Sequence, residues 1–260
     1  MHLVFASGFL VPQRLIGVDY FRGVSAAFPD AIFPAVSPIA SIAQRASTLA
    51  DAIQTAFPSG PIHVVAHSLG GLDTRFVLAR NLRGLGAPGR IVALSTISTP
   101  HRGSPIADLL VGPEPGGHDF RTLNYRVIRA LAADIGLDAD ALAELSSGFA
   151  AAFNRDCPDV AHVLYRSYAG GAQESIALKA AHLYCEFVGA TADDRINDGL
   201  VPLASARWGT FVDPVWPTDH IGEVGHSLNA PALVSRFDHL TAYRQIVDSV
   251  AAAAAARGLP

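Results

Sequence analysis

Residues 62–71 read IHVVAHSLGG and carry the strongest structural signal in the chain. The apolar run Ile62–Ala66, which includes one histidine, is typical of a buried central strand, and a helical pattern follows over residues 72–82. Between them lies Ala-x-Ser-x-Gly. A strand, a sharp turn and a helix in this order form the context of a nucleophile elbow. We therefore expect the turn to hold the Ser68 hydroxyl above a sheet.

The same turn predicts a site for a developing negative charge. Leu69 follows the serine at the helix N-terminus, where its backbone N–H can face an oxyanion. The alternative interpretation is a tight strand–helix turn that carries an ordinary serine. The apolar strand before Ser68 and the helix after it favour the elbow.

Apolar runs and helical patterns alternate outward from this stretch in both directions. The expected strands are residues 3–6, 31–36, 62–66, 91–97, 162–168, 182–188 and 208–212, and the expected helices are 42–53, 72–82 and 237–256. Such alternation predicts an α/β fold with a mostly parallel sheet that helices cover on both faces. We see no internal repeat and no separating linker, so we expect one domain over residues 1–260.

One stretch departs from this alternation. A cluster of glycines and prolines at residues 112–117 precedes an apolar stripe at helical spacing, which leucines continue to Leu145. The stripe consists of Phe120, Leu123, Val127 and Leu131. We expect a helical insertion over about residues 112–148 at the C-terminal edge of the sheet. Two interpretations remain open, a packed cap helix and a mobile lid with an apolar underside.

Composition excludes several classes of protein. Of the 260 residues, 50% are hydrophobic and 16% charged, with a net charge of −4 and Lys179 as the single lysine. No basic block exists, so binding to nucleic acid or to an anionic membrane through a basic patch is not expected. No apolar run reaches the roughly 18–20 residues of a membrane span.

The cysteines and the N-terminus add two further expectations. Two cysteines, Cys157 and Cys185, cannot form a disulfide framework or a cysteine zinc site, although one bridge between them stays open. The first residues lack the charged region of a signal peptide and enter a strand pattern at once. We expect either a cytoplasmic protein or a mature secreted form.

A serine nucleophile needs a base, and the base needs an orienting acid. In a hydrolase sheet of this kind the chain order is serine, then Asp or Glu, then His. Asp198 lies in a turn after the expected strand 182–188, and His220 lies in a loop before the final helix. The competing acids Asp193, Asp194 and Asp219 are interpreted as solvated loop charges. His226 and His239 are later alternatives for the base.

Other residues of the right type have simpler interpretations. His67 neighbours the serine, so its side chain should point elsewhere; His63 lies inside a strand, and His101 is expected to brace a loop. The second elbow-like sequence around Ser227 lacks a preceding strand and the final glycine. The sequence GLGAPG at residues 84–89 follows a helix and precedes a strand, the reverse of a dinucleotide-binding loop.

At this point the motifs match a known family. The chain resembles the bacterial true lipases of the α/β-hydrolase fold, the Pseudomonas–Burkholderia–Proteus group. The matching segments span most of the chain in the right order: Gly8–Leu10, Leu15–Phe21, Ala66–Gly71, Thr99–Ser104, Asn197–Val201, Asp219–Ile221 and Tyr243–Gln245. The resemblance implies Ser68 as nucleophile, Asp198 as acid, His220 as base, and an oxyanion hole from the backbone N–H groups of Phe9 and Leu69.

Two departures from the family pattern carry weight. The family has His-Gly after the first strand, whereas this chain has Ser7-Gly8. The family also binds a structural calcium through an acid two positions after the histidine, a glutamine four further on and an upstream aspartate. Here Gly222 and His226 stand at the first two positions, and the upstream segment is shorter than in the family. Because calcium needs several oxygen ligands, we expect no metal and no cofactor. The insertion is also shorter than the family's lid.

The sequence thus predicts a serine ester hydrolase acting on carboxylic esters of acyl lipids through an acyl-enzyme, with lipid-interface contact through the lid. Because an imidazole ordinarily titrates near pH 6.5 and a base must be neutral, activity should fall below about pH 6. The alternatives are a short-chain or polyester carboxylesterase, an acyltransferase, and an inactive hydrolase fold used for binding.

Overall fold

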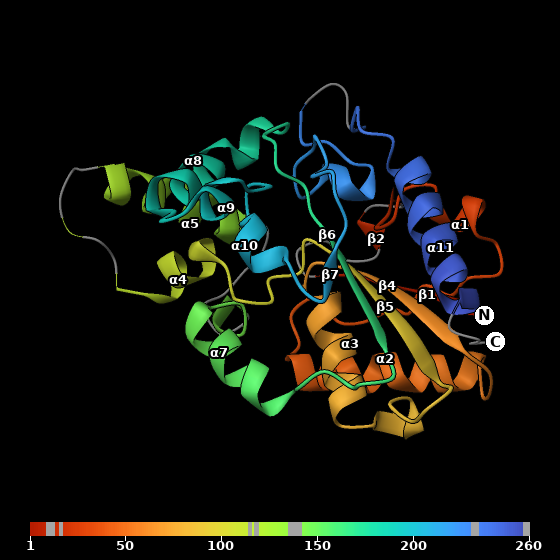
Figure 1. Ribbon diagram of the computed structural model, residues 1–260. Helices are drawn as coiled ribbons and strands as arrows, with labels where there is room; N and C mark the ends of the chain where they lie inside the picture. The colour runs from red at the N-terminus through yellow and green to blue at the C-terminus, as the bar shows by residue number, and fades with distance from the viewer. Residues whose placement is uncertain are drawn as a thin grey trace.

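Five parallel strands form the central sheet of the computed structural model, in the order β1-β4-β5-β6-β7 (Figure 1). They are β1 (His2–Ala6), β4 (Ile62–His67), β5 (Ile91–Ile97), β6 (Leu164–Tyr168) and β7 (Thr210–Phe211). The structure describes residues 1–8, 14–15, 18–113, 116, 120–134, 142–229 and 234–256. The expected α/β fold with a parallel sheet is confirmed.

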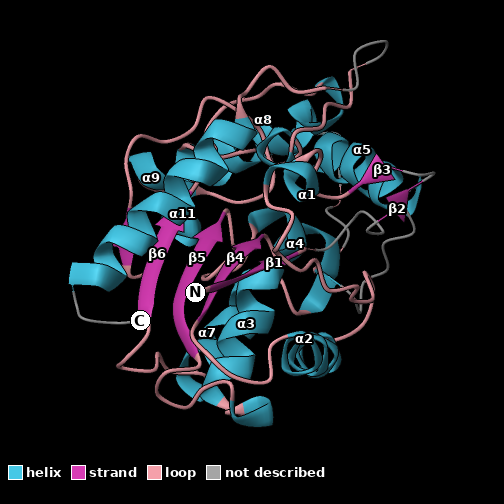
Figure 2. Cartoon of the chain, turned by 90° about the vertical axis from the view of Figure 1, so that its right-hand side faces the viewer, coloured by secondary structure: helices cyan, strands magenta, loops and turns pink. Residues whose placement is uncertain are grey.

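Helices cover both faces of this sheet. On one face lie α2 (Ile42–Ala56) and α3 (Gly70–Ala79), and on the other lie α1 (Val24–Ala27) and α11 (His239–Ala256). Figure 2 shows the sheet between α11 on one side and α2 and α3 on the other. Helix α2 begins at a capping box, in which Ser41 and Gln44 each accept the other's backbone N–H.

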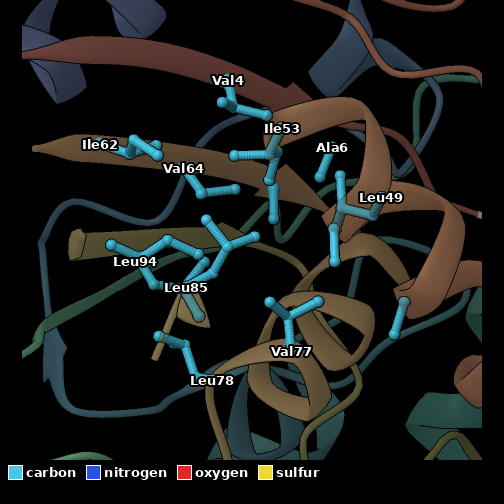
Figure 3. Close-up of a cluster of buried hydrophobic side chains, with 14 of the residues drawn as sticks. Val4, Ala6, Leu49, Ile53, Ile62, Val64, Val77, Leu78, Leu85 and Leu94 are labelled. Atoms are coloured by element: carbon cyan, nitrogen blue, oxygen red, sulfur yellow. The ribbon is translucent and has the colours of Figure 1, made fainter. Parts of the chain in front are cut away.

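The two faces explain why β4 lacks a polar–apolar alternation. Val64 and Ala66 join the cluster under α2 and α3, together with Val4 and Leu49 (Figure 3). Val65 points to the opposite face and packs in the cluster that includes residues of α1 and α11. Because both sides of the strand are covered, every residue of β4 is buried, and a continuous apolar run is required.

A separate group of helices gathers beyond the C-terminal ends of the strands, on the left of Figure 1. It consists of α4 (Pro105–Val111), α5 (Phe120–Asp134), α8 (Lys179–Val188), α9 (Ala192–Arg195) and α10 (Leu203–Ala206), with α7 (Ser147–Asp156) below it. Tyr125 and Ile128 of α5 pack in one cluster with Ile106 of α4 and Tyr184 of α8. Helix α5 is therefore a packed helix of this group.

The apolar stripe expected on this helix differs from its buried face. Leu123 is 63% exposed and Val127 41% exposed, whereas Tyr125 and Ile128 are buried. The side chains of Phe120 and Leu131 lie outside the described residues. The two described residues of the stripe are therefore exposed, and the buried face of α5 is formed by other residues of the helix.

The expected strand at residues 182–188 is also wrong, because these residues belong to helix α8. The buried residues Ala181, Tyr184 and Cys185 are three and four positions apart, which is the period of a helix and not of a strand. The segment begins at Lys179 and packs among helices, so it has no place in the sheet.

Smaller differences concern element lengths. Of residues 31–36, Ile32 makes an isolated bridge to Val4, and the strand expected at 208–212 is reduced to β7. The short elements are β2 (Arg14–Leu15), β3 (Val18–Asp19), η1 (Leu82–Gly84), η2 (Ile176–Leu178) and η3 (Gly222–Val224).

Two further expectations can be compared with the structure. Among the described residues, no helix combines the length and the apolar content needed to cross a membrane. Cys157 and Cys185 are both free and buried, and they lie in different clusters, so no bridge joins them.

Candidate active site

Ser68 lies on the sharp turn that joins β4 to α3, as the sequence predicts. Its φ of 55° is in the left-handed region, which costs a residue other than glycine about 1 kcal/mol or more. The turn is also crowded: a Cβ at Gly70 would lie 2.5 Å from the carbonyl oxygen of Ala6, and a Cβ at Gly8 would lie 2.5 Å from Cβ of Ser68. Only glycine fits at these two positions.

Asp198 and His220 form a buried hydrogen-bonded pair. Nδ1 of His220 lies 2.7 Å from Oδ2 of Asp198, and the His220 backbone N–H donates to the Asp198 carbonyl oxygen. The other carboxylate oxygen, Oδ1, accepts backbone N–H groups from Leu200 at 2.9 Å and Val201 at 2.7 Å. These bonds fix the carboxylate and turn Nε2 of His220 away from it.

The route by which Asp198 reaches this position differs from the expected one. It follows helix α9, because residues 182–188 are helical, and it lies against the end of β6 instead. A Cβ placed on Gly170, two residues beyond β6, would lie 3.3 Å from Cβ of Asp198. The acid therefore stands at the C-terminal edge of the sheet, although not after a strand at residues 182–188.

The serine turn and the Asp198–His220 pair meet at this edge. The rings of His67 and His220 lie 4.5 Å apart, and His67 immediately precedes the serine. The Ser68 backbone N–H donates to the carbonyl oxygen of Ile97 at the end of β5. The structure thus brings the Ser68 turn and the Asp198–His220 pair together beside the C-terminal ends of β4, β5 and β6.

Two segments could supply donors to an oxyanion. Leu69 stands at the N-cap of α3, and no group in the described part of the chain accepts a hydrogen bond from its N–H. Phe9, the other expected donor, lies outside the described residues. The preceding residue, Gly8, is described and buried, and its N–H donates to the Tyr20 hydroxyl at 3.0 Å.

A buried ion pair supports the loop that leads to Phe9. The Arg45 side chain donates to Oδ2 of Asp73 at 2.9 Å and to the carbonyl oxygens of Ser7 and Gly8 at 2.8 and 3.2 Å. Burial raises the pKa of Asp73 to about 7, although the Arg45 charge opposes this rise. Arg45 therefore ties the loop after β1 to helices α2 and α3.

The competing acids have structural partners. The expectation that Asp219 is a solvated loop charge is wrong: it is buried and accepts the N–H groups of Ser175 and Gly222. Asp193 pairs with Arg207, and Asp194 caps helix α9. Each of these three carboxylates is thus engaged away from the His220 ring.

The competing histidines also lie elsewhere. His101 is buried and braces its loop through Thr96 and Arg75, as expected. Nε2 of His63 bonds the Ser95 hydroxyl inside the sheet. His226 and His239, the alternatives for the base, bond the backbone carbonyl oxygens of Asp19 and Arg22.

Glu223 is the residue that the sequence did not indicate. It is buried in η3, three positions after His220, and its Oε2 lies 3.9 Å from Nδ1 of His220. Burial raises the pKa of this carboxyl, and the Asp198 charge raises it further. His67, His220 and Glu223 offer atoms within 4.8 Å of one another, the one such group in the described part of the chain that could hold a metal ion. These atoms are already hydrogen-bonded to one another or to Asp198.

The residues beside His220 do not fit the calcium ion that the family resemblance implies. Gly222 supplies no side-chain oxygen, and a Cβ there would lie 2.0 Å from Oγ1 of Thr218 and 2.8 Å from Oε2 of Glu174. The Glu174 carboxylate accepts bonds from the hydroxyls of Thr218 and Ser235. Protein side chains therefore fill the space beside Gly222.

Comparison with solved structures finds lipases and esterases. Solved structures with the same arrangement include the mature form of the Bacillus licheniformis lipase BlEst2, with a TM-score of 0.65 and 23% identity over 85% of this chain and 84% of that one. The chain has the fold of lipases and esterases. No model of a protein family matches it.

Sequence relatives carry the same kind of name. A triacylglycerol lipase of Vibrio cholerae is 23% identical over 94% of this chain and 85% of its own length. Triacylglycerol lipase 2 of Saccharomyces cerevisiae is 29% identical over 72% of this chain, and the match spans 53% of that relative, about half its length. Both relatives are thus named triacylglycerol lipases.

Proposed function

We propose that this chain is a serine ester hydrolase that cleaves carboxylic esters of acyl lipids. The observation that carries the proposal is the buried Asp198–His220 hydrogen bond beside the strained turn of Ser68. The lipase-like fold and the relatives named triacylglycerol lipases support it. On the sequence motifs we also place the chain with the Pseudomonas–Burkholderia–Proteus lipases, as one domain over residues 1–260.

In the proposed reaction, Nε2 of His220 removes the proton from the Ser68 hydroxyl as its oxygen attacks the ester carbonyl carbon. Asp198 holds the proton on Nδ1, so the imidazole presents a lone pair at Nε2. His220 then protonates the departing alcohol, which leaves an acyl group on Ser68. Water, activated by the same imidazole, releases the acid and restores the serine.

The negative charge on the carbonyl oxygen needs donors that are already in place. We assign this role to the backbone N–H groups of Leu69 and Phe9. The position of Leu69 at the start of α3, with no acceptor among the described groups, supports this assignment. A single donor of this kind typically contributes about 10²–10³ in rate.

Apolar side chains on the helical group suggest where a lipid surface would lie. Leu123 and Val127 on α5, and Leu183 and Phe187 on α8, are large apolar residues four positions apart that remain exposed. Because α5 and α8 pack on each other, we propose that these two pairs contact the lipid interface. No metal or cofactor is part of the proposal.

The decisive test is the Ser68→Ala variant. We expect it to lose hydrolysis of a p-nitrophenyl ester by at least about 10³-fold, because the nucleophile is gone. A fluorophosphonate probe should label the parent protein at Ser68 and leave the variant unlabelled. A parent protein that the probe does not label would instead support an inactive fold used for binding.

Substrate class needs a second measurement. A p-nitrophenyl ester series of increasing acyl length, run beside an emulsified triglyceride, separates a lipase from a short-chain or polyester esterase, and an added alcohol acceptor reveals acyl transfer. Leu123→Ser should lower activity on the emulsion relative to the soluble ester. Ile39→Ser is the matched control, because Ile39 is also 63% exposed but lies outside α5 and α8. Equal losses in both variants would contradict the interface surface.

A further inference from the structure

A continuous line of buried hydrogen bonds connects the loop after β1 to Glu223, three positions after His220. The Gly8 N–H lies 3.0 Å from the Tyr20 hydroxyl oxygen, which lies 2.6 Å from Nδ1 of His67. Nε2 of His67 lies 2.9 Å from Oε2 of Glu223. All four residues are buried, and they come from four separate segments of the chain.

We assign the directions of these bonds from Gly8 toward Glu223, whose carboxylate accepts at the far end. Because the Gly8 N–H donates to the Tyr20 oxygen, the Tyr20 O–H is free to donate to Nδ1 of His67. His67 then carries its proton on Nε2 and donates it to Glu223. Burial, and after it the neighbouring His220, lower the pKa of His67 well below its ordinary value, so the ring stays neutral. Each donor in the line has an acceptor.

Glu223 anchors the far end of this line. Its Oε1 accepts the Ser98 hydroxyl at 2.5 Å and the Gly170 N–H at 2.6 Å, while Oε2 accepts His67. Ser98 and Gly170 follow β5 and β6, so the carboxylate joins the ends of two strands to the turn that carries His220.

We propose that Tyr20, His67 and Glu223 are positioning residues that hold Gly8, the last described residue of the loop after β1, and the His220 base in a fixed mutual arrangement. Gly8 immediately precedes Phe9, and Glu223 lies 3.9 Å from the imidazole, so the line ends beside both assigned groups. The inference rests on the proposed ester hydrolase function. It predicts that breaking the line slows catalysis without altering the acyl-binding surface, because small misplacements of reacting groups cost up to about 100-fold in rate.

The test is Tyr20→Phe, with Tyr243→Phe as the matched control. Both tyrosines are buried in the same apolar cluster, but the Tyr243 hydroxyl has no hydrogen-bond partner among the described residues. We expect Tyr20→Phe to lower kcat by about 10- to 100-fold with KM within about threefold, and to slow fluorophosphonate labelling of Ser68 in proportion. Tyr243→Phe should leave both rates unchanged.

A double variant distinguishes a connected line from separate structural contacts. In Glu223→Gln the amide oxygen is expected to stay with the two donors Ser98 and Gly170, so the NH₂ group faces Nε2 of His67 and the line is interrupted at its other end. If the line acts as one unit, Tyr20→Phe with Glu223→Gln should lose little more than the worse single variant. Multiplied losses would overturn the proposal, and so would a Tyr20→Phe rate within twofold of Tyr243→Phe.

The protein's fold and function are checked separately. Circular dichroism and thermal unfolding establish that each variant is folded at the assay temperature. Should either single variant fail to fold, Ser98→Ala removes one donor to Glu223 and should lower kcat by at least about fivefold; a kcat equal to that of Tyr243→Phe would again overturn the proposal. Full activity in Ser68→Ala would instead reject Ser68 as the nucleophile, and with it the proposed serine hydrolase mechanism on which the inference rests.

Discussion

Nδ1 of His220 donates a hydrogen bond of 2.7 Å to Oδ2 of Asp198, and neither side chain is exposed. A carboxylate in this position determines which ring nitrogen carries the proton. It also stabilises the imidazolium that forms when His220 accepts the serine proton. The proposed role of His220 as a base therefore requires a carboxylate, and not an amide, at position 198.

Replacement of Asp198 by Asn should reduce kcat by about 10³–10⁴-fold with little loss of stability. The new amide keeps an oxygen for the N–H groups of Leu200 and Val201, but its NH₂ group faces His220 and moves the ring proton to Nε2. Steady-state kinetics on a soluble ester measure the effect. Asp193→Asn, at a partly exposed acid outside the site, is the control; a loss below tenfold for Asp198→Asn would refute the assigned role.

Two glycine-to-alanine changes should have opposite effects on stability. A Cβ at Gly70 would meet the carbonyl oxygens of Ala6 and Ser7, so Gly70→Ala should lower the free energy of unfolding by about 1–3 kcal/mol. Gly148 lies inside α7 with nothing within 4 Å of the position that an added Cβ would take, so Gly148→Ala should raise it by up to about 1 kcal/mol. Urea unfolding measures the free energy of unfolding of both variants. A Gly70→Ala protein as stable as the parent would contradict the crowding seen at this turn.

Buried neutral histidines should make the fold sensitive to acid. Burial and the nearby Arg166 charge lower the pKa of His63 to about 3, against about 6.5 in an unfolded chain. Between these values the unfolded state binds the extra proton, so stability is full above pH 6.5 and falls as the pH drops toward 3, by about 1.4 kcal/mol per pH unit for this group. Urea unfolding over this range should show a shallower fall for His63→Gln. If the free energy of unfolding falls equally steeply with pH in the parent and in His63→Gln, the lowered pKa of His63 is not the cause of the acid sensitivity.

Chelation should leave both activity and thermal stability unchanged. We expect this because Gly222 offers no ligand oxygen and the Glu174 carboxylate is engaged by Thr218 and Ser235. Glu174→Gln should lower stability by about 1–2 kcal/mol, since it weakens charge-assisted hydrogen bonds, and added calcium should not restore it. If EDTA lowers the Tm of the parent protein and calcium restores it, the chain binds the ion after all.

The sequence predicts those parts of the fold in which the pattern is long and uniform. The buried strand of residues 62–66, the turn at Ser68 and the helix after it all follow from local rules of size and periodicity. The strand expected at 182–188 is wrong because a short apolar run fits either period, and Tyr184 and Cys185 are buried on one face of a helix.

The supporting residues of the site are not predictable in the same way. His67 and Glu223 are 156 positions apart in sequence, and their contact exists only because the turn with Glu223 lies across the C-terminal ends of β6, β5 and β4. No local pattern distinguishes Glu223 from an exposed glutamate, and the burial of Asp219 escapes prediction for the same reason. Ser68, Asp198 and His220 can be proposed from sequence because hydrolases of this kind place serine, acid and histidine in a fixed order along the chain. The residues that support these three side chains depend on tertiary packing.

The crowded elbow also indicates where this protein can be redesigned. Gly8, Gly70 and Gly71 each have a neighbouring atom within 2.5 Å of the position a Cβ would take, so combinatorial libraries should leave them constant. Exposed positions such as Leu123 and Leu183 stand on helices outside the sheet and can be randomised at little cost to folding. New ester preferences should therefore be selected from variation in α5 and α8, while the elbow is inherited unchanged.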